Sequence, residues 1–212
     1  MLLKVCGMRE EENIRAVEKL PVDLVGFIFY PRSPRYVDTL PGYMPRSAGR
    51  VGVFVNEELH VIEETIARYR LTHVQLHGNE TPALCHALKQ QGVQVIKAFS
   101  VSVADDLKAT GNYSASCDLF LFDTATSGYG GSGRSFDWEI LQHYTGAVPF
   151  LLSGGIGEDD AAKVAAFRHS RFAGIDLNSR FELSPGIKDI DKLNRFIKKL
   201  KDDEPNTTTV RP

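Results

Sequence analysis

Two residues of this sequence could transfer protons. Asp123 ends an apolar run and is followed at once by a glycine-rich loop, in the stretch LFDTATSGYGGSGRSFDW over residues 121–138. Cys6 ends another apolar run, in KVCGM. A carboxyl group near its ordinary pKa of ~3.9 is an acid at neutral pH only if burial or negative neighbours raise that pKa. A thiol near ~8.5 becomes a base only if its surroundings lower its pKa.

Both residues also have a purely structural interpretation. An aspartate before a loop often caps it by accepting backbone amide hydrogens. A single cysteine is commonly a small core residue, which is the role we expect for Cys85 and Cys117. The odd number of cysteines and their spacing favour neither disulfides nor a zinc site, and the histidines lack ligand partners at suitable spacing, so we expect no metal.

The elements that must hold these residues are short apolar runs rich in Val, Ile, Leu and Phe. They lack strict alternation, which is typical of strands buried on both faces of a parallel sheet. The runs are LLKVC, DLVGFIF, RVGVFV, HVQL, VQVIKAF, DLFLF, VPFLL and FAGIDL. Helical stripes lie between them, for example Leu59, Ile62, Ile66 and Tyr69, and Ile190, Leu193, Ile197 and Leu200.

Eight strand-helix units in this length predict one α/β domain, a single (β/α)₈ TIM barrel over residues 1–202. The prolines and glycine of residues 41–45 predict that the second unit is irregular. Residues 203–212 carry no apolar stripe, so we expect a disordered tail. In such a barrel the strands' carboxyl ends share one mouth, and residues 124–135 could close over it as a lid or simply form a surface loop.

The net charge and the lengths of the apolar runs indicate what class of partner the protein binds. A formal net charge of −2 gives no reason to expect nucleic acid or an anionic membrane. No apolar run has the length of a membrane span or a signal peptide, so we expect a cytoplasmic protein that acts on a small molecule.

Ordered motifs then point to one family. KVCGM, GFIFYPRSPRYV, VGVFVN, VQLHGNE, FDTATSGYGGSGRSFDW, LLSGGI and GIDLNSRFE with PGIKD follow one another from Lys4 to Asp189. The chain resembles phosphoribosylanthranilate isomerase. This resemblance implies a barrel enzyme of tryptophan biosynthesis that converts N-(5-phosphoribosyl)anthranilate to a carboxyphenylamino-deoxyribulose phosphate by an Amadori rearrangement, without a cofactor. It leaves open whether the protein is a monomer or a homodimer.

The resemblance also implies roles for residues. It makes Asp123 the general acid, Cys6 the general base and Arg35 the ligand of the anthranilate carboxylate, whereas Arg32 is expected to be a solvated loop residue. The positions expected to bind the rest of the phosphosugar are Gly154, Gly155, Asp176, Asn178 and Ser179. Glycine turns and a short helix after strands 7 and 8 are common phosphate sites, although a tight turn alone would also need the glycines.

Two positions are less certain in role. Family members often have glycine where this chain has Arg180, so either the loop follows another path or Arg180 adds a cation to the phosphate site. His77 is expected to orient other groups rather than to react.

Two other functions remain open from the sequence. Lys97, at the end of VIKAF, could form a Schiff base in a lyase or aldolase. Alternatively, the barrel could bind a phosphosugar without catalysis.

Overall fold

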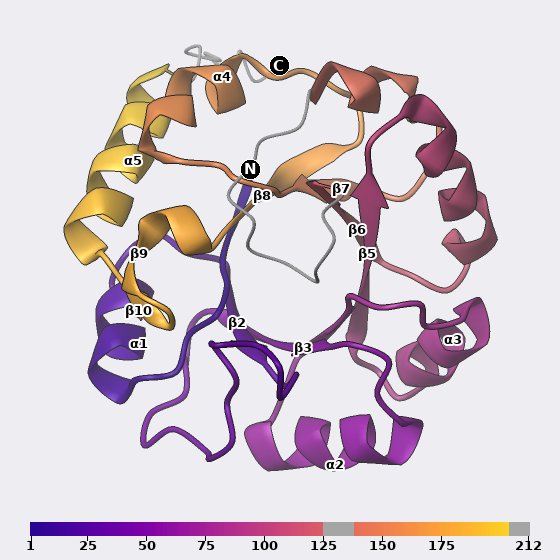
Figure 1. Ribbon diagram of the computed structural model, residues 1–212, viewed down its shortest axis with the longest axis horizontal. Coiled ribbons are helices and arrows are strands. Elements are labelled where there is room, and N and C mark those ends of the chain that lie inside the picture. The colour runs from indigo at the N-terminus through magenta and orange to yellow at the C-terminus, as the bar shows by residue number, and fades with distance from the viewer. Residues whose placement is uncertain (125–137, 204–212) are drawn as a thin grey trace, which may run out of the picture.

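The computed structural model describes residues 1–124 and 138–203, and it contains a closed barrel of eight parallel strands. Figure 1 looks into the ring of strands, with the helices arranged around it. The barrel strands are β1 (Leu2–Val5), β2 (Leu24–Ile28), β3 (Gly49–Phe54), β4 (His73–Leu76), β5 (Gln94–Val101), β6 (Leu119–Thr124), β7 (Phe150–Leu152) and β8 (Phe172–Leu177). The predicted fold class is therefore confirmed.

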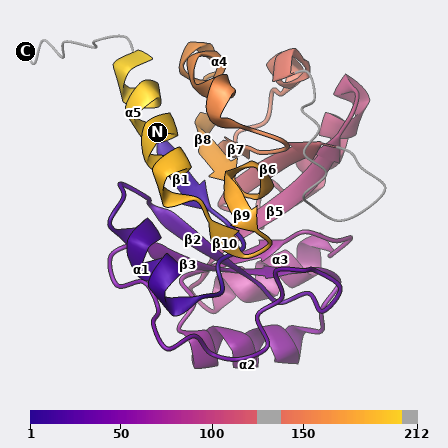
Figure 2. The same ribbon diagram turned by 60° about the vertical axis from the view of Figure 1, so that its left-hand side comes forward.

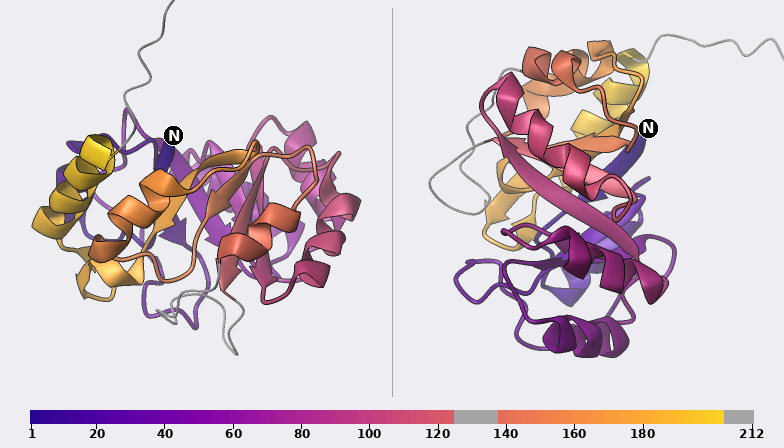
Figure 3. Two further views of the ribbon diagram at one scale, coloured as in Figure 1. Left: turned by 90° about the horizontal axis from the view of Figure 1, so that it is seen from above. Right: turned by 90° about the vertical axis from the view of Figure 1, so that its right-hand side faces the viewer.

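Helices cover the outside of this sheet, as the side views of Figure 3 show. The α-helices are α1 (Glu11–Glu18), α2 (Leu59–Tyr69), α3 (Pro82–Gln90), α4 (Ala161–Ala166) and α5 (Ile190–Asp203). The 3₁₀ segments are η1 (Ala104–Tyr113), η2 (Trp138–His143), η3 (Glu158–Asp160) and η4 (Ser179–Phe181). Within the described residues, no helix is long and apolar enough to cross a membrane.

The expected local signals explain several element boundaries. The Thr81 hydroxyl oxygen accepts a hydrogen bond from the Leu84 amide at 3.3 Å, and Pro82 occupies the first turn of α3. In α2, Ile62 and Tyr69 of the predicted stripe are buried. The hydrogen bond fixes the start of α3, and the buried side chains of α2 join the apolar cluster beneath that helix.

The barrel closes through pairing of β1 with β8. Lys4 pairs with Asp176 and Val5 with Leu177, so the two strands run in register to the same end of the barrel. Inside the ring, Cys6 packs with apolar side chains from β3, β5, β6 and β7. A larger apolar cluster fills the space between the sheet and the helices.

Some elements differ from the sequence interpretation. Residues 29–48 contain no helix, as expected from their prolines and glycine. A small antiparallel hairpin of β9 (Glu182–Ser184) and β10 (Ile187–Lys188) follows η4 and was not predicted, because its strands are too short to show alternation. It comes forward in Figure 2.

The last described helix, α5, ends at Asp203, beside the boundary expected between residues 202 and 203. The predicted disorder of the rest of the tail lies outside the described residues. The same holds for the predicted lid, except Thr124, which is the last residue of β6.

Candidate active site

A cavity of about 500 Å³ opens where the barrel strands end. It is lined from β1, β2, β3, β4, β6, β7 and β8 and the segments that follow them. All eight residues predicted for the site line this one cavity: Cys6, Arg35, Asp123, Gly154, Gly155, Asp176, Asn178 and Ser179. The expected convergence of strand ends at one mouth is thus observed, whereas the roles of these residues remain predictions.

Cys6 lies just beyond β1 and reaches the cavity from the inside of the barrel. Its side chain is 3% exposed. The neighbouring strand makes room for it, because a Cβ atom on Gly26 would lie 2.6 Å from the Cys6 sulfur. The absence of a side chain at position 26 therefore sets the position of the thiol.

A buried ion pair lies beside this thiol. Lys4 Nζ donates a hydrogen bond to Asp176 Oδ1 at 2.8 Å, and the Ser153 hydroxyl donates to Asp176 Oδ2 at 3.4 Å. Burial lowers the pKa of Lys4, but Asp176 and Cys6 outweigh it and raise that pKa above its ordinary value. Lys4 is therefore a permanent cation at neutral pH.

The pKa of the Cys6 thiol differs in direction from the sequence expectation. Burial raises it and Asp176 adds to this, and together they outweigh the opposing effects of Lys4 and Lys188. The positive charges of Lys4 and Lys188 lie near the thiol. The free-energy cost of desolvating a thiolate inside the closed barrel is larger than the stabilisation that these charges give. Without substrate, Cys6 is therefore protonated at neutral pH.

Asp123, the residue expected to be the general acid, lies near the end of β6 and is 9% exposed. Its Oδ2 atom is 3.5 Å from His77 Nε2, and His77 Nδ1 lies 3.0 Å from the side-chain nitrogen of Gln75. The Gln75 side chain thus holds one ring nitrogen of His77, and the other, Nε2, faces Asp123. This arrangement agrees with the orienting role expected for His77.

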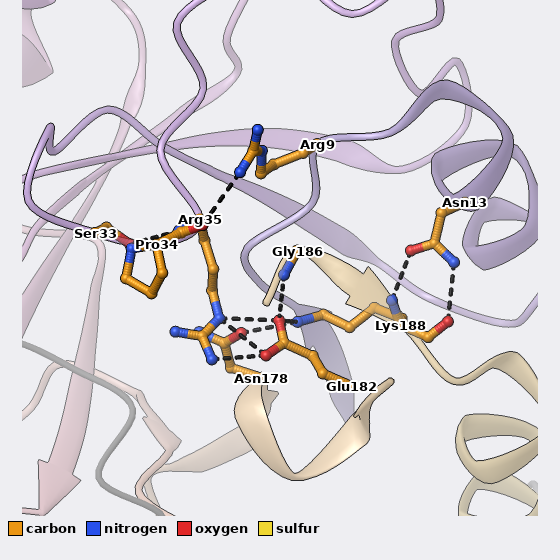
Figure 4. A network of polar contacts seen from close by, with 9 residues as sticks. All are labelled: Arg9, Asn13, Ser33, Pro34, Arg35, Asn178, Glu182, Gly186 and Lys188. Atoms are coloured by element: carbon orange, nitrogen blue, oxygen red, sulfur yellow. Dashed lines mark hydrogen bonds and ion pairs between the residues drawn. The ribbon is translucent and has the colours of Figure 1, made fainter. Parts of the chain in front are cut away.

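Arg35 belongs to a polar network at the rim of the barrel (Figure 4). Its guanidinium donates to Glu182 from Nε at 2.9 Å and from Nη2 at 2.6 Å. Lys188 Nζ lies 2.7 Å from Glu182 and also donates to Asn178 Oδ1 at 2.8 Å. Burial opposes ionisation of Glu182, but Arg35 and Lys188 outweigh it and lower its pKa, so the carboxylate is charged at neutral pH.

The segments after β7 and β8 supply the glycine turn and short helix that were expected. Gly154 and Gly155 both have positive φ, at 85° and 76°, which favours glycine. Arg180 is in η4 with no positive φ, so the loop takes a path that an arginine can follow without strain, and its side chain lines the cavity. Arg32 is exposed, as expected, and also reaches the cavity lining.

Lys97 is placed away from this cavity. It lies on β5 between Ile96 and Ala98, which face the barrel interior, so it points toward the surrounding helices. Its Nζ atom is 3.2 Å from Glu80 and donates to three backbone carbonyl groups. A buried amine held in this way gives no support to the Schiff-base alternative.

The cysteines and the possible metal ligands bear on two expectations, that there is no disulfide and that there is no metal. Cys85 and Cys117 are buried free thiols, as predicted. Among residues 1–124 and 138–203, no group of three or more His, Cys, Asp or Glu side chains could hold a metal ion.

Sequence reasoning placed Gln75 with His77 at the mouth but missed three polar residues around the cavity: Lys4, Glu182 and Lys188. Lys4 lies inside an apolar strand run, where a long polar side chain is unusual and could have served as a signal. Glu182 and Lys188 depend on the unpredicted hairpin, so no local pattern marks them.

The fold and the cavity define a single-domain (β/α)₈ barrel enzyme with its site at the carboxyl ends of the strands. Comparison with known proteins gives its family. Residues 3–199 match the family described as N-(5'phosphoribosyl)anthranilate (PRA) isomerase. The chain belongs to this family of tryptophan biosynthesis enzymes.

Individual relatives agree with that assignment. The chain is 52% identical to the N-(5'-phosphoribosyl)anthranilate isomerase of Phocaeicola vulgatus, over 95% of this chain and 98% of the relative. It is 50% identical to that of Parabacteroides distasonis, over 94% and 93%.

Solved structures give the same result. The phosphoribosyl anthranilate isomerase of Thermotoga maritima has a TM-score of 0.81 at 34% identity and covers 95% of this chain and 100% of its own. Another isomerase of this kind, in complex with reduced 1-(o-carboxyphenylamino)-1-deoxyribulose 5-phosphate, has a TM-score of 0.78 at 31% identity, with the same coverage.

Proposed function

We propose that this protein converts N-(5-phosphoribosyl)anthranilate to 1-(2-carboxyphenylamino)-1-deoxyribulose 5-phosphate without a cofactor, using Asp123 as general acid and Cys6 as general base. The observation that carries this proposal is that both side chains line one cavity in a chain of this family. The remaining groups of the cavity suit the two charged ends of the substrate.

The proposed reaction begins with Asp123. Its carboxyl group gives a proton to the furanose ring oxygen while the bond from C1 to that oxygen breaks. The nitrogen lone pair forms the C1=N bond of a protonated Schiff base. The neighbouring His77, whose Nε2 atom lies 3.5 Å from Asp123, holds the carboxyl group in position.

Cys6 first loses its thiol proton to solvent, and its thiolate then takes the proton from C2. The electrons of that C–H bond form a C1=C2 double bond, and the nitrogen regains its lone pair. Proton transfer from the C2 hydroxyl to C1 completes the amino ketose. After the reaction, exchange with solvent returns a proton to Asp123. The positive Schiff base acidifies the C2 hydrogen, and its charge together with Lys4 favours the thiolate that burial alone disfavours.

The two charged groups of the substrate, a carboxylate and a phosphate, are assigned to the two ends of the cavity. We assign the anthranilate carboxylate to Arg35, because a guanidinium can hold it through two parallel hydrogen bonds. We assign the phosphate end to Gly154, Gly155 and Ser179, with Arg180 as an added cation, because a glycine turn brings backbone amides close to an anion. Asp176 and Asn178 contact the rest of the sugar.

The test follows the fluorescence of phosphoribosylanthranilate during its loss with the wild type, Cys6→Ser and Asp123→Asn. Each substitution is expected to lower kcat by at least about 100-fold, with an unchanged circular dichroism spectrum. Wild-type turnover by Asp123→Asn would show that the acid is another group. Binding of a substrate analogue by the wild type without turnover would instead favour the noncatalytic barrel.

Expectations about partners and location complete the proposal. A related isomerase from Thermotoga maritima is described as dimeric, and this chain is expected to be a monomer or a homodimer, which light scattering distinguishes. The cytoplasmic location and the lack of a nucleic-acid partner stay predictions from composition.

A further inference from the structure

The contact between Arg35 and Glu182 uses only one edge of the guanidinium. Glu182 receives hydrogen bonds from Nε and Nη2, at 2.6–3.1 Å. Within residues 1–124 and 138–203, the Nη1 atom makes no hydrogen bond. Arg35 lines the cavity, and its Nη1–Nη2 edge keeps hydrogens that Glu182 does not use and that can be donated to a second carboxylate. The geometry in Figure 4 thus holds the arginine from one side and leaves its end free.

Lys188 changes the charge balance of this contact. Its ammonium group is fully buried and forms an ion pair with Glu182 at 2.7 Å. Burial lowers the pKa of Lys188 and the contact with Glu182 opposes this shift; with the Lys188 amine protonated, Arg35, Glu182 and Lys188 together carry one net positive charge. Without Lys188, Glu182 would cancel the charge of Arg35 and weaken the attraction for a second carboxylate. The trio therefore fixes the arginine and keeps its charge available.

The carboxylate of Glu182 is itself fixed by the hairpin. The Gly186 amide donates to Glu182 Oε1 at 3.1 Å, and the side chain of Glu182 is 5% exposed. Asn13 pairs with the backbone of Lys188, donating to its carbonyl at 2.9 Å and accepting from its amide at 2.8 Å. Because several donors hold the Glu182 carboxylate, its position is fixed. The guanidinium of Arg35 therefore takes the orientation that this carboxylate allows.

We propose that Glu182 is a positioning residue for substrate recognition: it fixes the Arg35 guanidinium side-on, so that the open edge meets the carboxylate of the substrate's aromatic ring. This inference rests on the proposed function, because it takes Arg35 as the ligand of that carboxylate. It adds to it a residue that does not line the cavity and acts through Arg35.

The test compares two ligands by calorimetry. One is reduced 1-(o-carboxyphenylamino)-1-deoxyribulose 5-phosphate, and the other is the same compound without the ring carboxylate. Glu182→Asp keeps the charge but withdraws the carboxylate from Arg35. It is expected to weaken binding of the first ligand about tenfold and of the second by less than about twofold. In turnover, KM is expected to rise about tenfold while kcat changes by less than about twofold.

Glu182→Gln is the second variant and has nearly the wild-type volume. It is also expected to weaken the first ligand selectively, because an amide offers only one acceptor to the two guanidinium donors. If Glu182 acted only by opposing the charge of Arg35, this variant would bind the first ligand more tightly than the wild type. In an Arg35→Met background, Glu182→Asp is expected to have no further effect on the difference between the two ligands.

Three results would overturn the inference. They are tighter binding by Glu182→Gln, an equal loss for both ligands in the two variants, and unchanged binding of both ligands in either variant. A wild type that binds neither ligand would overturn the proposed function and this inference with it. A wild type that binds both ligands, together with variants that bind both as tightly as the wild type, would overturn only the role of Glu182.

Discussion

Lys4 and Asp176 form an ion pair at 2.8 Å inside the barrel, on the two strands whose pairing closes the sheet. Both side chains are buried, and Asp176 also reaches the cavity beside Cys6. Burying two charges is costly unless they meet each other and other polar groups. The pair therefore links closure of the barrel to the charge around the thiol.

Replacing Lys4 should affect both stability and chemistry. Lys4→Met leaves Asp176 as a buried charge without its cation, which is expected to lower the free energy of unfolding by about 3 kcal/mol. Since the cation lowers the pKa of Cys6, its loss is also expected to raise that pKa further and to reduce kcat. Urea denaturation measures the first effect, and the pH dependence of thiolate absorbance measures the second.

The double variant Lys4→Met, Asp176→Asn separates these effects. It removes both buried charges and is expected to recover most of the lost stability without recovering kcat. If Lys4→Met alone kept wild-type stability and kcat, the ion pair would be irrelevant to either property.

Gly26 provides a steric test of the thiol position. A Cβ atom there would lie 2.6 Å from the Cys6 sulfur and 3.1 Å from its Cα atom, which is closer than packed atoms tolerate. Gly26→Ala is therefore expected to displace Cys6, lowering kcat by about tenfold or more and the free energy of unfolding by about 1–3 kcal/mol. Steady-state kinetics and urea denaturation measure the two changes.

Gly111→Ala is the matched control, because nothing lies within 4 Å of a Cβ atom at that position. We expect wild-type kinetics from it. Equal activity of the two alanine variants would mean that the barrel relaxes around the new methyl group and that the thiol position is not set by Gly26.

His77 offers a test of how Asp123 is oriented. His77→Leu keeps an apolar body of similar size but removes the Nε2 group that lies 3.5 Å from Asp123. We expect kcat to fall about tenfold with little change in KM, because the acid is less well placed rather than absent. His86→Leu, at an exposed position of α3, is expected to leave both constants unchanged. A kcat of His77→Leu equal to that of wild type would remove His77 from the mechanism.

Glu18 predicts how stability depends on pH. This carboxylate accepts hydrogen bonds from the Tyr43 hydroxyl and from the Arg46 and Ser47 amides. Burial acts against it, but these bonds outweigh burial and lower the pKa of Glu18 to about 2. A lowered folded-state pKa gives stability that is complete above about 4.5 and is lost as the pH falls toward about 2.

Glu18→Gln is expected to reduce the free energy of unfolding at neutral pH by about 1 kcal/mol, a value reduced for solvent screening. It should also flatten the acid limb of a stability curve measured by urea denaturation between pH values of about 2 and 6. Glu64→Gln, an exposed carboxylate of α2, should leave the curve unchanged. The same flattening in both variants would show that overall charge, not the hydrogen bonds of Glu18, sets the acid limb.

The sequence predicts strands and their order well, because runs such as DLFLF and VPFLL are apolar, and this local pattern alone indicates a buried strand. It also predicts Cys6 and Asp123 at one mouth, since each follows such a run and a parallel barrel gathers the strand ends. It does not predict the raised pKa of Cys6, because desolvation depends on what covers the thiol. The contact of Arg35 with Glu182 joins residues 147 positions apart through a hairpin too short to leave a pattern.

Asn13 holds the backbone of Lys188 across 175 positions of chain. During synthesis the thiol of Cys6 and the neighbouring Lys4 therefore emerge early, but Asp176 and Lys188 arrive only with the eighth strand and the hairpin behind it. A nascent chain still lacking the eighth strand and that hairpin would carry the thiol and Lys4 without Asp176 and Lys188, so enzymatic competence should appear abruptly, near the end of translation, rather than grow with chain length.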